Sequence, residues 1–311
     1  MDDPIVLEGL TKSFGDFKAL DSVDLRVRKN SFTGFLGPNG AGKSTTLKIL
    51  TNLIKATAGS AYINGIDVTK DSKNALANVG VVVETPEFYP YLTPREIFGY
   101  IGELHGMTHE EIDAESEDIL ELLKMTEWSD KRIGQFSKGM KQRIAIGQAL
   151  LTDPEIVILD EPTSGLDPRG MVEIREILES LRSSGLTIFM SSHMLYEVSE
   201  LCDRVAIIEK GKIIADGSVD ELLRTNGIRR VEVQTLNEIS NSILETIGSW
   251  KEVNMVQRSS PHSMEINLSG GEKEQAELLS KLIALGLGVF EMTSSGSNLE
   301  SLYMELVKES R

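Results

Sequence analysis

The segment GPNGAGKS, residues Gly37 to Ser44, decides which fold this chain can adopt. It fills every fixed position of the pattern G-x-x-x-x-G-K-[ST], in which backbone N–H groups and a helix N-terminus surround a phosphate. A strand-like stretch, SFTGFLG, precedes it and a helical one, KSTTLKILTNLI, follows. We therefore expect a nucleotide loop, with Lys43 at the β- and γ-phosphates and the Ser44 hydroxyl on Mg²⁺. The residues expected to contact the nucleotide are Gly37, Pro38, Asn39, Gly40, Ala41, Gly42, Lys43, Ser44 and Thr45.

A second acidic motif completes the expected site. In IVILDEP four apolar residues form a buried strand that delivers Asp160 and Glu161 at its carboxyl end, where open α/β sheets bind ligands. By analogy with other phosphate-loop ATPases, Asp160 would hold Mg²⁺, directly or through water. Glu161 would polarise the attacking water as general base; the plainer alternative is that it merely ends the strand.

The rest of the first 225 residues alternates strand and helix patterns. Apolar strand candidates include VGVVVE, EIVILD, LTIFMSS and DRVAIIEKGKII, with helical stretches between them. This order predicts an α/β fold with a largely parallel sheet covered on both sides. Residues 94–149 are mostly helical and charged, which predicts an inserted helical subdomain.

The second predicted domain covers residues 228–311. The helix GSVDELLRT ends at Asn226 and Gly227, a natural stop and turn. Beyond it the pattern reads strand, helix, strand, strand, helix, strand, followed by an amphipathic helix LESLYMELVKE. We expect a small α+β domain.

Composition narrows the class of function. The 311 residues carry a formal net charge of −16, which argues against binding to a nucleic-acid backbone. The single cysteine, Cys202, excludes an internal disulfide. No stretch approaches the roughly 20 apolar residues that span a bilayer, and the acidic start MDDPIVLEG is no secretory signal. We expect a soluble, cytoplasmic chain whose membrane role, if any, passes through separate subunits.

The chain resembles the ATP-binding cassette (ABC) ATPase family in four motifs. These are the phosphate loop, the two acidic residues, SGLD (Ser164 to Asp167) and the SSH that ends at His193. The resemblance covers about residues 4–225, and the motifs follow one another in the same order as in that family. It implies a phosphate-loop NTPase core, Mg-ATP hydrolysis, and two subunits that face each other head to tail around two nucleotides. It also implies transmembrane permease subunits that would hold the ATPase at the inner face of the cell membrane.

The resemblance fixes the place of the family's signature motif, just before the strand that carries Asp160. The sequence there is FSKGM, Phe136 to Met140. Ser137 and Gly139 match the family and would contact the nucleotide of the opposite subunit. Lys138 stands where glycine is usual, and it would either add positive charge near the γ-phosphate or point to solvent.

A further departure lies at Glu84, where the family usually has the glutamine of its Q-loop. A carboxylate can ligate Mg²⁺ or bind its water, although it adds negative charge beside Asp160 and Glu161. Glutamate at this place and an S-x-G-M signature both resemble the drug-, bacitracin- and lantibiotic-resistance branch of exporters. The segment after Glu84, TPEFYPYLTP, would dock a cytoplasmic helix of the permease or form an ordinary proline-stabilised loop.

Three further site residues follow from the resemblance. His193 matches the switch histidine that contacts the γ-phosphate and positions Glu161. Asp167 would couple the two sites of the dimer. Phe14 would stack on the adenine, with Phe17 as the second choice.

The expected function is that of the ATPase subunit of an exporter, which pairs with a second copy or a related cassette and drives a separate permease. The alternative is a soluble ABC ATPase that acts on the ribosome or in DNA repair. Those relatives usually show two cassettes, a long coiled coil or zinc cysteines, which this chain lacks. The small second domain leaves a regulatory or dimerising module possible.

The stretch INLSGGEKEQAELL, residues 266–279, spells the family signature more fully but lies after every catalytic motif. Its pattern predicts a helix start with Ser269 at the N-cap and Glu272 completing a capping box. The buried face of that helix is expected to be Leu278, Leu279, Leu282 and Ile283.

Overall fold

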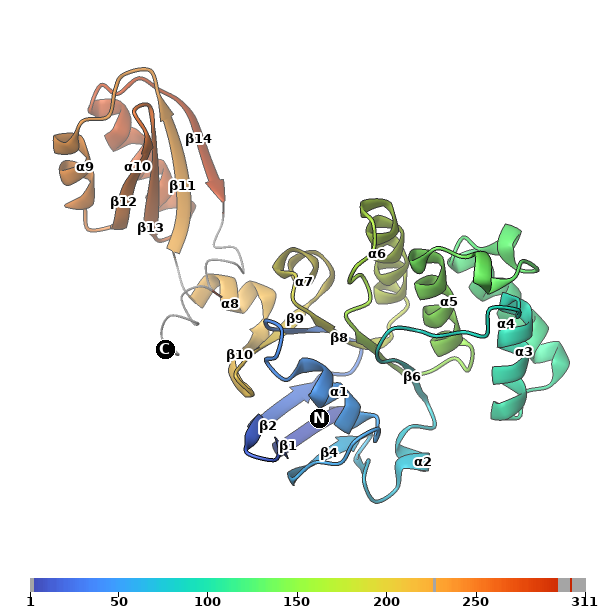
Figure 1. The fold of residues 1–311 in the computed structure, drawn as a ribbon. Coiled ribbons are helices and arrows are strands. Elements are labelled where there is room, and N and C mark those ends of the chain that lie inside the picture. The colour runs from blue at the N-terminus through green and yellow to red at the C-terminus, as the bar shows by residue number, and fades with distance from the viewer. Residues whose placement is uncertain (1–2, 226–227, 296–302, 304–311) are drawn as a thin grey trace. The chain divides into compact units, whose positions relative to one another are not determined.

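The computed structural model describes residues 3–225, 228–295 and 303 (Figure 1). The chain divides into two compact units, Met1–Gly217 and Ser218–Arg311. The division therefore precedes helix α8 (Val219–Thr225), which the sequence assigned to the first domain.

A six-stranded sheet forms the centre of the first unit, in the order β10-β9-β3-β8-β7-β6. The neighbouring strands from β9 to β6 pair in parallel, which confirms the predicted sheet. All residues of β3 are buried, as are the first four of β7, which is typical of strands covered on both faces. The strands are β3 (Phe32–Leu36), β6 (Val79–Val82), β7 (Ile156–Asp160), β8 (Thr187–Ser192), β9 (Arg204–Glu209) and β10 (Lys212–Ser218).

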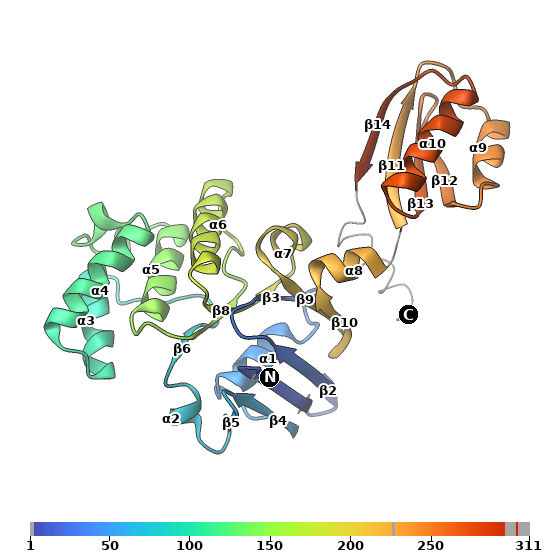
Figure 2. The same ribbon diagram turned by 180° about the vertical axis from the view of Figure 1, so that it is seen from behind.

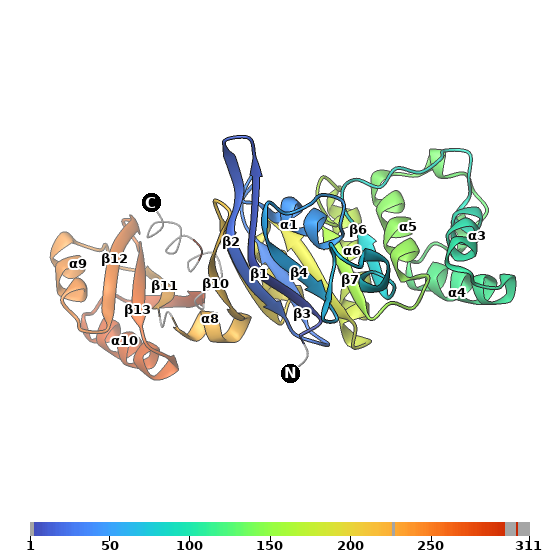
Figure 3. The same ribbon diagram turned by 90° about the horizontal axis from the view of Figure 1, so that it is seen from below.

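The first unit also contains an antiparallel sheet, which the sequence patterns did not separate from the parallel one. Its order is β2-β1-β4-β5, with strands β1 (Ile5–Phe14), β2 (Phe17–Val27), β4 (Ala58–Ile63) and β5 (Ile66–Asp67). Buried residues of helix α1 (Lys43–Leu50) share one hydrophobic core with residues of both sheets, and Figure 3 shows the helix among their strands. The start of this helix is thereby fixed between two sheets.

The remaining helices of the first unit are α2 (Ser72–Ala75), α3 (Pro94–His105), α4 (His109–Leu122), α5 (Lys138–Leu150), α6 (Pro168–Ser183) and α7 (Leu195–Leu201), with short 3₁₀ turns at Thr126–Trp128 and Ile133–Gln135. Helices α3, α4 and α5 gather at one end of this unit (Figure 3). Helix α5 approaches β6 so closely that a Cβ on Gly80 would lie 2.1 Å from the carbonyl oxygen of Ala149.

The second unit contains β11 (Ile228–Thr235), α9 (Asn241–Gly248), β12 (Val253–Ser260), β13 (Ser263–Ser269), α10 (Glu272–Ala284) and β14 (Val289–Ser295) (Figure 2). Its antiparallel order β12-β13-β11-β14 confirms the predicted α+β arrangement. Buried residues of both helices share one core with the strands, so α9 and α10 cover the same sheet face. The amphipathic stretch at residues 299–309 lies outside the described residues apart from Tyr303.

The expected capping box at Ser269 is wrong. Ser269 is the last residue of β13, paired with Ile228, and its hydroxyl donates to Oδ1 of Asn254 at 2.9 Å. The chain turns at Gly270, and the N-cap of α10 is Gly271, whose N–H donates to the carboxylate of Glu274 at 2.7 Å. Strand pairing thus extends through the residue that the local pattern assigned to the helix start. On the helix, Leu278 and Leu282 are buried as expected, whereas Ile283 is 59% exposed.

Candidate functional site

The loop Gly37–Gly42 joins the buried strand β3 to helix α1 and has room only for glycine at critical points. Gly40 and Gly42 have φ of +81° and +112°, which other residues rarely adopt. A Cβ on Gly37 would lie 2.4 Å from the carbonyl oxygen of Ile208. These glycines allow the tight turn that leads an anion to the start of α1, while the N–H groups of Gly37 and Ala41 donate to the carbonyl oxygens of Ser192 and Pro38.

Lys43 is buried although it carries a charge, with 4% of its surface exposed. Its Nζ donates to the carbonyl oxygens of Gly37 at 2.7 Å and Pro38 at 3.2 Å, and lies 3.1 Å from Oε1 of Glu161. The ammonium thus spans the mouth of the loop and meets the acidic residue that follows β7.

Glu161 stands at the turn after β7 with φ of +45°, a strained conformation for a non-glycine residue. Its N–H donates to the carbonyl oxygen and to Oγ of Ser191, at 3.2 and 3.0 Å, which holds the turn against β8. Its Oε2 lies 2.9 Å from Nδ1 of His193. The structure therefore brings Lys43, Glu161 and His193 together; the sequence had linked only His193 to Glu161.

The electrostatic surroundings of Glu161 keep it ionised. Burial acts to raise its pKa, but the hydrogen bond and charge of Lys43, followed by the charge of His193, outweigh burial, so the pKa lies below its ordinary value. At neutral pH the carboxylate can therefore accept a proton from water.

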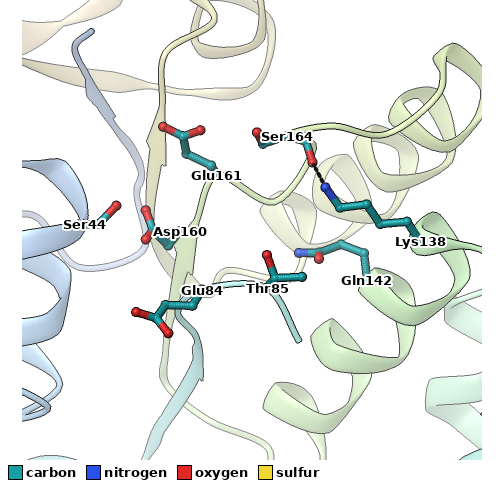
Figure 4. A pocket seen from close by; sticks show the side chains of 8 residues that line it. All are labelled: Ser44, Glu84, Thr85, Lys138, Gln142, Asp160, Glu161 and Ser164. Atoms are coloured by element: carbon teal, nitrogen blue, oxygen red, sulfur yellow. Dashed lines mark hydrogen bonds between the residues drawn. The ribbon is translucent and has the colours of Figure 1, made fainter. Parts of the chain in front are cut away.

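An oxygen-rich hollow lies beside this group (Figure 4). Asp160 points into it and accepts a short hydrogen bond from Oγ of Ser191. Its lining residues are Ser44, Glu84, Thr85, Lys138, Gln142, Asp160, Glu161 and Ser164. A hydroxyl and carboxylates are the ligands that Mg²⁺ prefers, so these residues fit that ion. Within the described residues no group of three or more His, Cys, Asp or Glu could hold a metal.

Glu84 lines the hollow but its carboxylate is already paired. It forms an ion pair with Nζ of Lys48 on α1, and its side chain is 62% exposed. Its φ of +74° is again unusual for a non-glycine residue. Glu84, the expected metal ligand, is thus held by Lys48 of the helix that follows the phosphate loop.

A second hollow, of about 380 Å³, lies beside the phosphate loop and shares Ser44 and Glu161 with the first. Phe14 and Phe17 face each other across the β1–β2 hairpin and both line it, together with Gly40, Gly42 and Thr45. The two residues are 51% and 64% exposed and so do not belong to the core. Both are therefore available to a flat ligand beside the loop.

The signature and SGLD residues lie on helix starts. Ser137 is the N-cap of α5, where its Oγ accepts from the N–H of Met140 at 3.2 Å. Asp167 is the N-cap of α6, where its Oδ1 accepts from the N–H of Gly170 at 3.1 Å. Ser137, Gly139 and Asp167 line neither hollow, whereas Lys138 lines the one around Asp160.

Nothing in the sequence indicated supporting roles for Ser191, Ser192 and Glu197. The hydroxyl of Ser191 contacts Asp160 and the N–H of Glu161, and Oγ of Ser192 donates to the buried Glu197 at 2.9 Å. Glu197, on α7, has only 2% of its surface exposed. The only sequence signal is their nearness to His193, since their partners are set by the tertiary structure.

A phosphate loop, an acidic pair after the neighbouring strand and a histidine on the glutamate define a nucleotide-hydrolysing ATPase of the phosphate-loop class. The family profile described as "ABC transporter" matches residues 20–164. Across 96% of its length the chain is 33% identical to the linearmycin resistance ATP-binding protein LnrL of Bacillus subtilis (strain 168), covering 96% of that protein. It is 35% identical to the bacitracin transport ATP-binding protein BcrA of Bacillus licheniformis, with 96% and 95% of the two chains covered.

Solved structures agree. The ATP-binding subunit of an ABC transporter superposes with a TM-score of 0.65 at 28% identity, over 72% of this chain and 93% of that one. A dimeric ATP-binding cassette in a post-hydrolysis state, bound to ADP and Pi, gives 0.61 at 26% identity over 69% and 98%. The chain belongs to the ABC transporter ATP-binding protein family, in the exporter branch expected from the sequence. It is an ATP-binding subunit that hydrolyses ATP to drive transport. Across the part of the chain that the structure covers, no helix is long and apolar enough to cross a membrane.

Proposed function

We propose that two copies of this chain, or one copy and a related cassette, close head to tail around two Mg-ATP molecules at the inner face of the cell membrane and drive a permease that exports an antibiotic-like compound. The proposal rests on one observation: Lys43 and His193 contact the two different carboxylate oxygens of Glu161. The nature of the cargo follows the relatives, which are named for linearmycin and bacitracin.

In the proposed reaction each residue has one role. Lys43 and the loop N–H groups bind the β- and γ-phosphates. Glu161 accepts the proton of the attacking water, and His193 holds the carboxylate and contacts the γ-phosphate. Phe14 stacks on the adenine. Ser137, Gly139 and Asp167 serve the nucleotide of the opposite subunit.

We assign the metal to Ser44 and Asp160, with Ser191 orienting the carboxylate of Asp160. Bound Mg²⁺ would neutralise charge on the β- and γ-phosphate oxygens. Glu84 would reach the ion, directly or through water, only after leaving Lys48.

The docking face for the permease is proposed to include the segment after Glu84. Tyr89 and Tyr91 stack with ring centroids 5.7 Å apart and remain 65% and 61% exposed. Aromatic rings exposed in this way are favourable contacts for a partner.

The experiment is affinity purification of the tagged full chain from its own cells in mild detergent. We expect a polytopic membrane protein to co-purify with the wild type and to be reduced with Tyr89→Ala plus Tyr91→Ala. Phe290→Ala, which changes an exposed aromatic residue of the second unit, is the matched control. Isolation of the chain without a membrane protein, but with ribosomes, would favour the non-transport alternative.

A further inference from the structure

Lys138 is the residue that the resemblance to known cassettes left without a role, and its ammonium has a defined partner. Its Nζ donates to the carbonyl oxygen of Ser164 at 2.8 Å (Figure 4). Lys138 is the first residue of α5, whereas Ser164 lies in the loop between Glu161 and α6. The contact therefore joins two segments that are 26 residues apart in the sequence.

The loop is shaped around this ammonium. Gly165 has φ of +67°, and a Cβ at that position would lie 2.5 Å from Nζ of Lys138. A side chain at residue 165 would therefore displace the ammonium as well as strain the backbone. A lysine at position 138 and a glycine at 165 fit each other.

The two helix starts also touch through their backbones. A Cβ on Gly139 would lie 3.6 Å from Cα of Gly170, so α5 and α6 meet within their first turns. Each start is fixed by its own N-cap, Ser137 for α5 and Asp167 for α6. The Lys138 contact closes this arrangement on the side of the hollow that holds Asp160 and Glu161.

We propose that Lys138 is a positioning residue that ties the start of α5 to the loop Ser164–Asp167, so that both segments approach the partner's nucleotide as one unit. This inference rests on the proposed function, because it takes Ser137, Gly139 and Asp167 to serve the opposite subunit. An ammonium has three N–H donors, but its geometry here directs one of them to a backbone carbonyl of its own chain. In this proposal Lys138 therefore acts through the loop, by the one donor that holds Ser164.

The direct test is amide hydrogen exchange of the full chain without nucleotide. In Lys138→Ala we expect exchange to rise by about threefold or more at the amides of residues 163–167 and to stay unchanged elsewhere, because the loop loses its tether. Lys138→Arg, which can still donate to the carbonyl, should restore the wild-type rate. Lys138→Gln, whose amide is shorter, should behave as alanine does and replaces it if that variant folds poorly. Arg132→Ala removes a positive charge from the exposed turn before α5 and is the matched control.

The kinetic test uses the same variants. Lys138→Ala should lower kcat by about threefold to tenfold and leave KM for ATP within about twofold, since ATP binding does not use this residue. Unchanged exchange at residues 163–167 would overturn the proposal. So would a raised KM with unaltered kcat and exchange, which would make Lys138 a direct phosphate contact. Turnover retained in Glu161→Gln would instead overturn the proposed function, and the exchange result would still judge Lys138.

Discussion

Oε2 of Glu161 lies 2.9 Å from Nδ1 of His193, while the other carboxylate oxygen lies 3.1 Å from Nζ of Lys43. The cations on both sides hold the carboxylate in one orientation. A base with a fixed orientation is one source of catalytic rate, and in the proposed reaction Lys43 leaves the carboxylate for the phosphates.

Replacing Glu161 by glutamine should separate binding from hydrolysis. The amide keeps the shape but cannot accept a proton, so we expect kcat to fall by about 100-fold to 10,000-fold while ATP binding persists. Turnover and equilibrium ATP binding measure the two effects. Glu155→Gln makes the same substitution at an exposed residue just before β7 and should leave both near wild type. Near-normal kcat in Glu161→Gln would refute the role of general base.

The lowered pKa of Glu161 predicts how stability depends on pH. Its ionised form is favoured in the folded chain, so that contribution is complete above the unfolded pKa of about 4.3 and is lost as pH falls through the lower folded pKa. Thermal unfolding of wild type and Glu161→Gln, compared from pH 7 to about pH 3.5, should show the wild-type advantage shrinking only at the acidic end. An advantage that grew on acidification would contradict the sign.

Ser137 and Ser269 should respond differently to alanine. Because Ser137 caps α5, Ser137→Ala should cost about 1 kcal/mol of stability and also lower ATP turnover. Ser269 ends a strand and bonds an exposed asparagine, so Ser269→Ala should cost less than about 0.5 kcal/mol and leave turnover unchanged. Denaturant titration and steady-state turnover give both values. A strong catalytic loss at Ser269 would mean that the LSGGE stretch acts as a signature after all.

Glu197 should matter for rate more than for substrate binding. Its carboxylate accepts from Ser192, the residue before His193, so Glu197→Ala should let that segment shift and lower kcat by about tenfold, with KM for ATP little changed. Glu197→Gln keeps an acceptor and should recover most of the rate. Glu200→Ala, on an exposed position of the same helix, is the control. Equal losses in the alanine and glutamine variants would exclude the hydrogen bond to Ser192 as the cause.

The aromatic pair on the β1–β2 hairpin is open to a direct test. Base stacking on an aromatic ring is worth about 1–3 kcal/mol, so Phe14→Ala should raise KM for ATP by roughly fivefold or more, whereas Phe14→Tyr should not. Phe17→Ala tests the second choice in the same assay. If Phe17→Ala alone raised KM, the stacking role would pass to that ring.

The sequence was sufficient wherever a local pattern dictates backbone geometry. The phosphate loop needs glycines at positive φ, and the short apolar run before Asp160 is typical of a buried strand, which the structure shows as β7. The strands and helices of the second unit followed from their apolar periods in the same way.

Sequence patterns failed where distant segments set the outcome. The pairing of Glu84 with Lys48 joins two elements that no motif links, and the antiparallel sheet around α1 depends on tertiary packing. The local pattern predicted a helix N-cap at Ser269, but the residue pairs with Ile228 as the end of a strand. Lys138 was left open for the same reason, because its partner Ser164 lies in another loop.

Gly80 of β6 lies close to Ala149, in the last turn of α5. Helix α5 has 13 residues and is about 20 Å long, so a tilt of about 3° about this contact moves its first residues by about 1 Å. Strand β6, which bears Gly80, leads directly toward Glu84 and the exposed tyrosines. A residue bulkier than glycine at position 80 would press on Ala149, and the tilt that follows would displace Ser137 at the opposite end of α5.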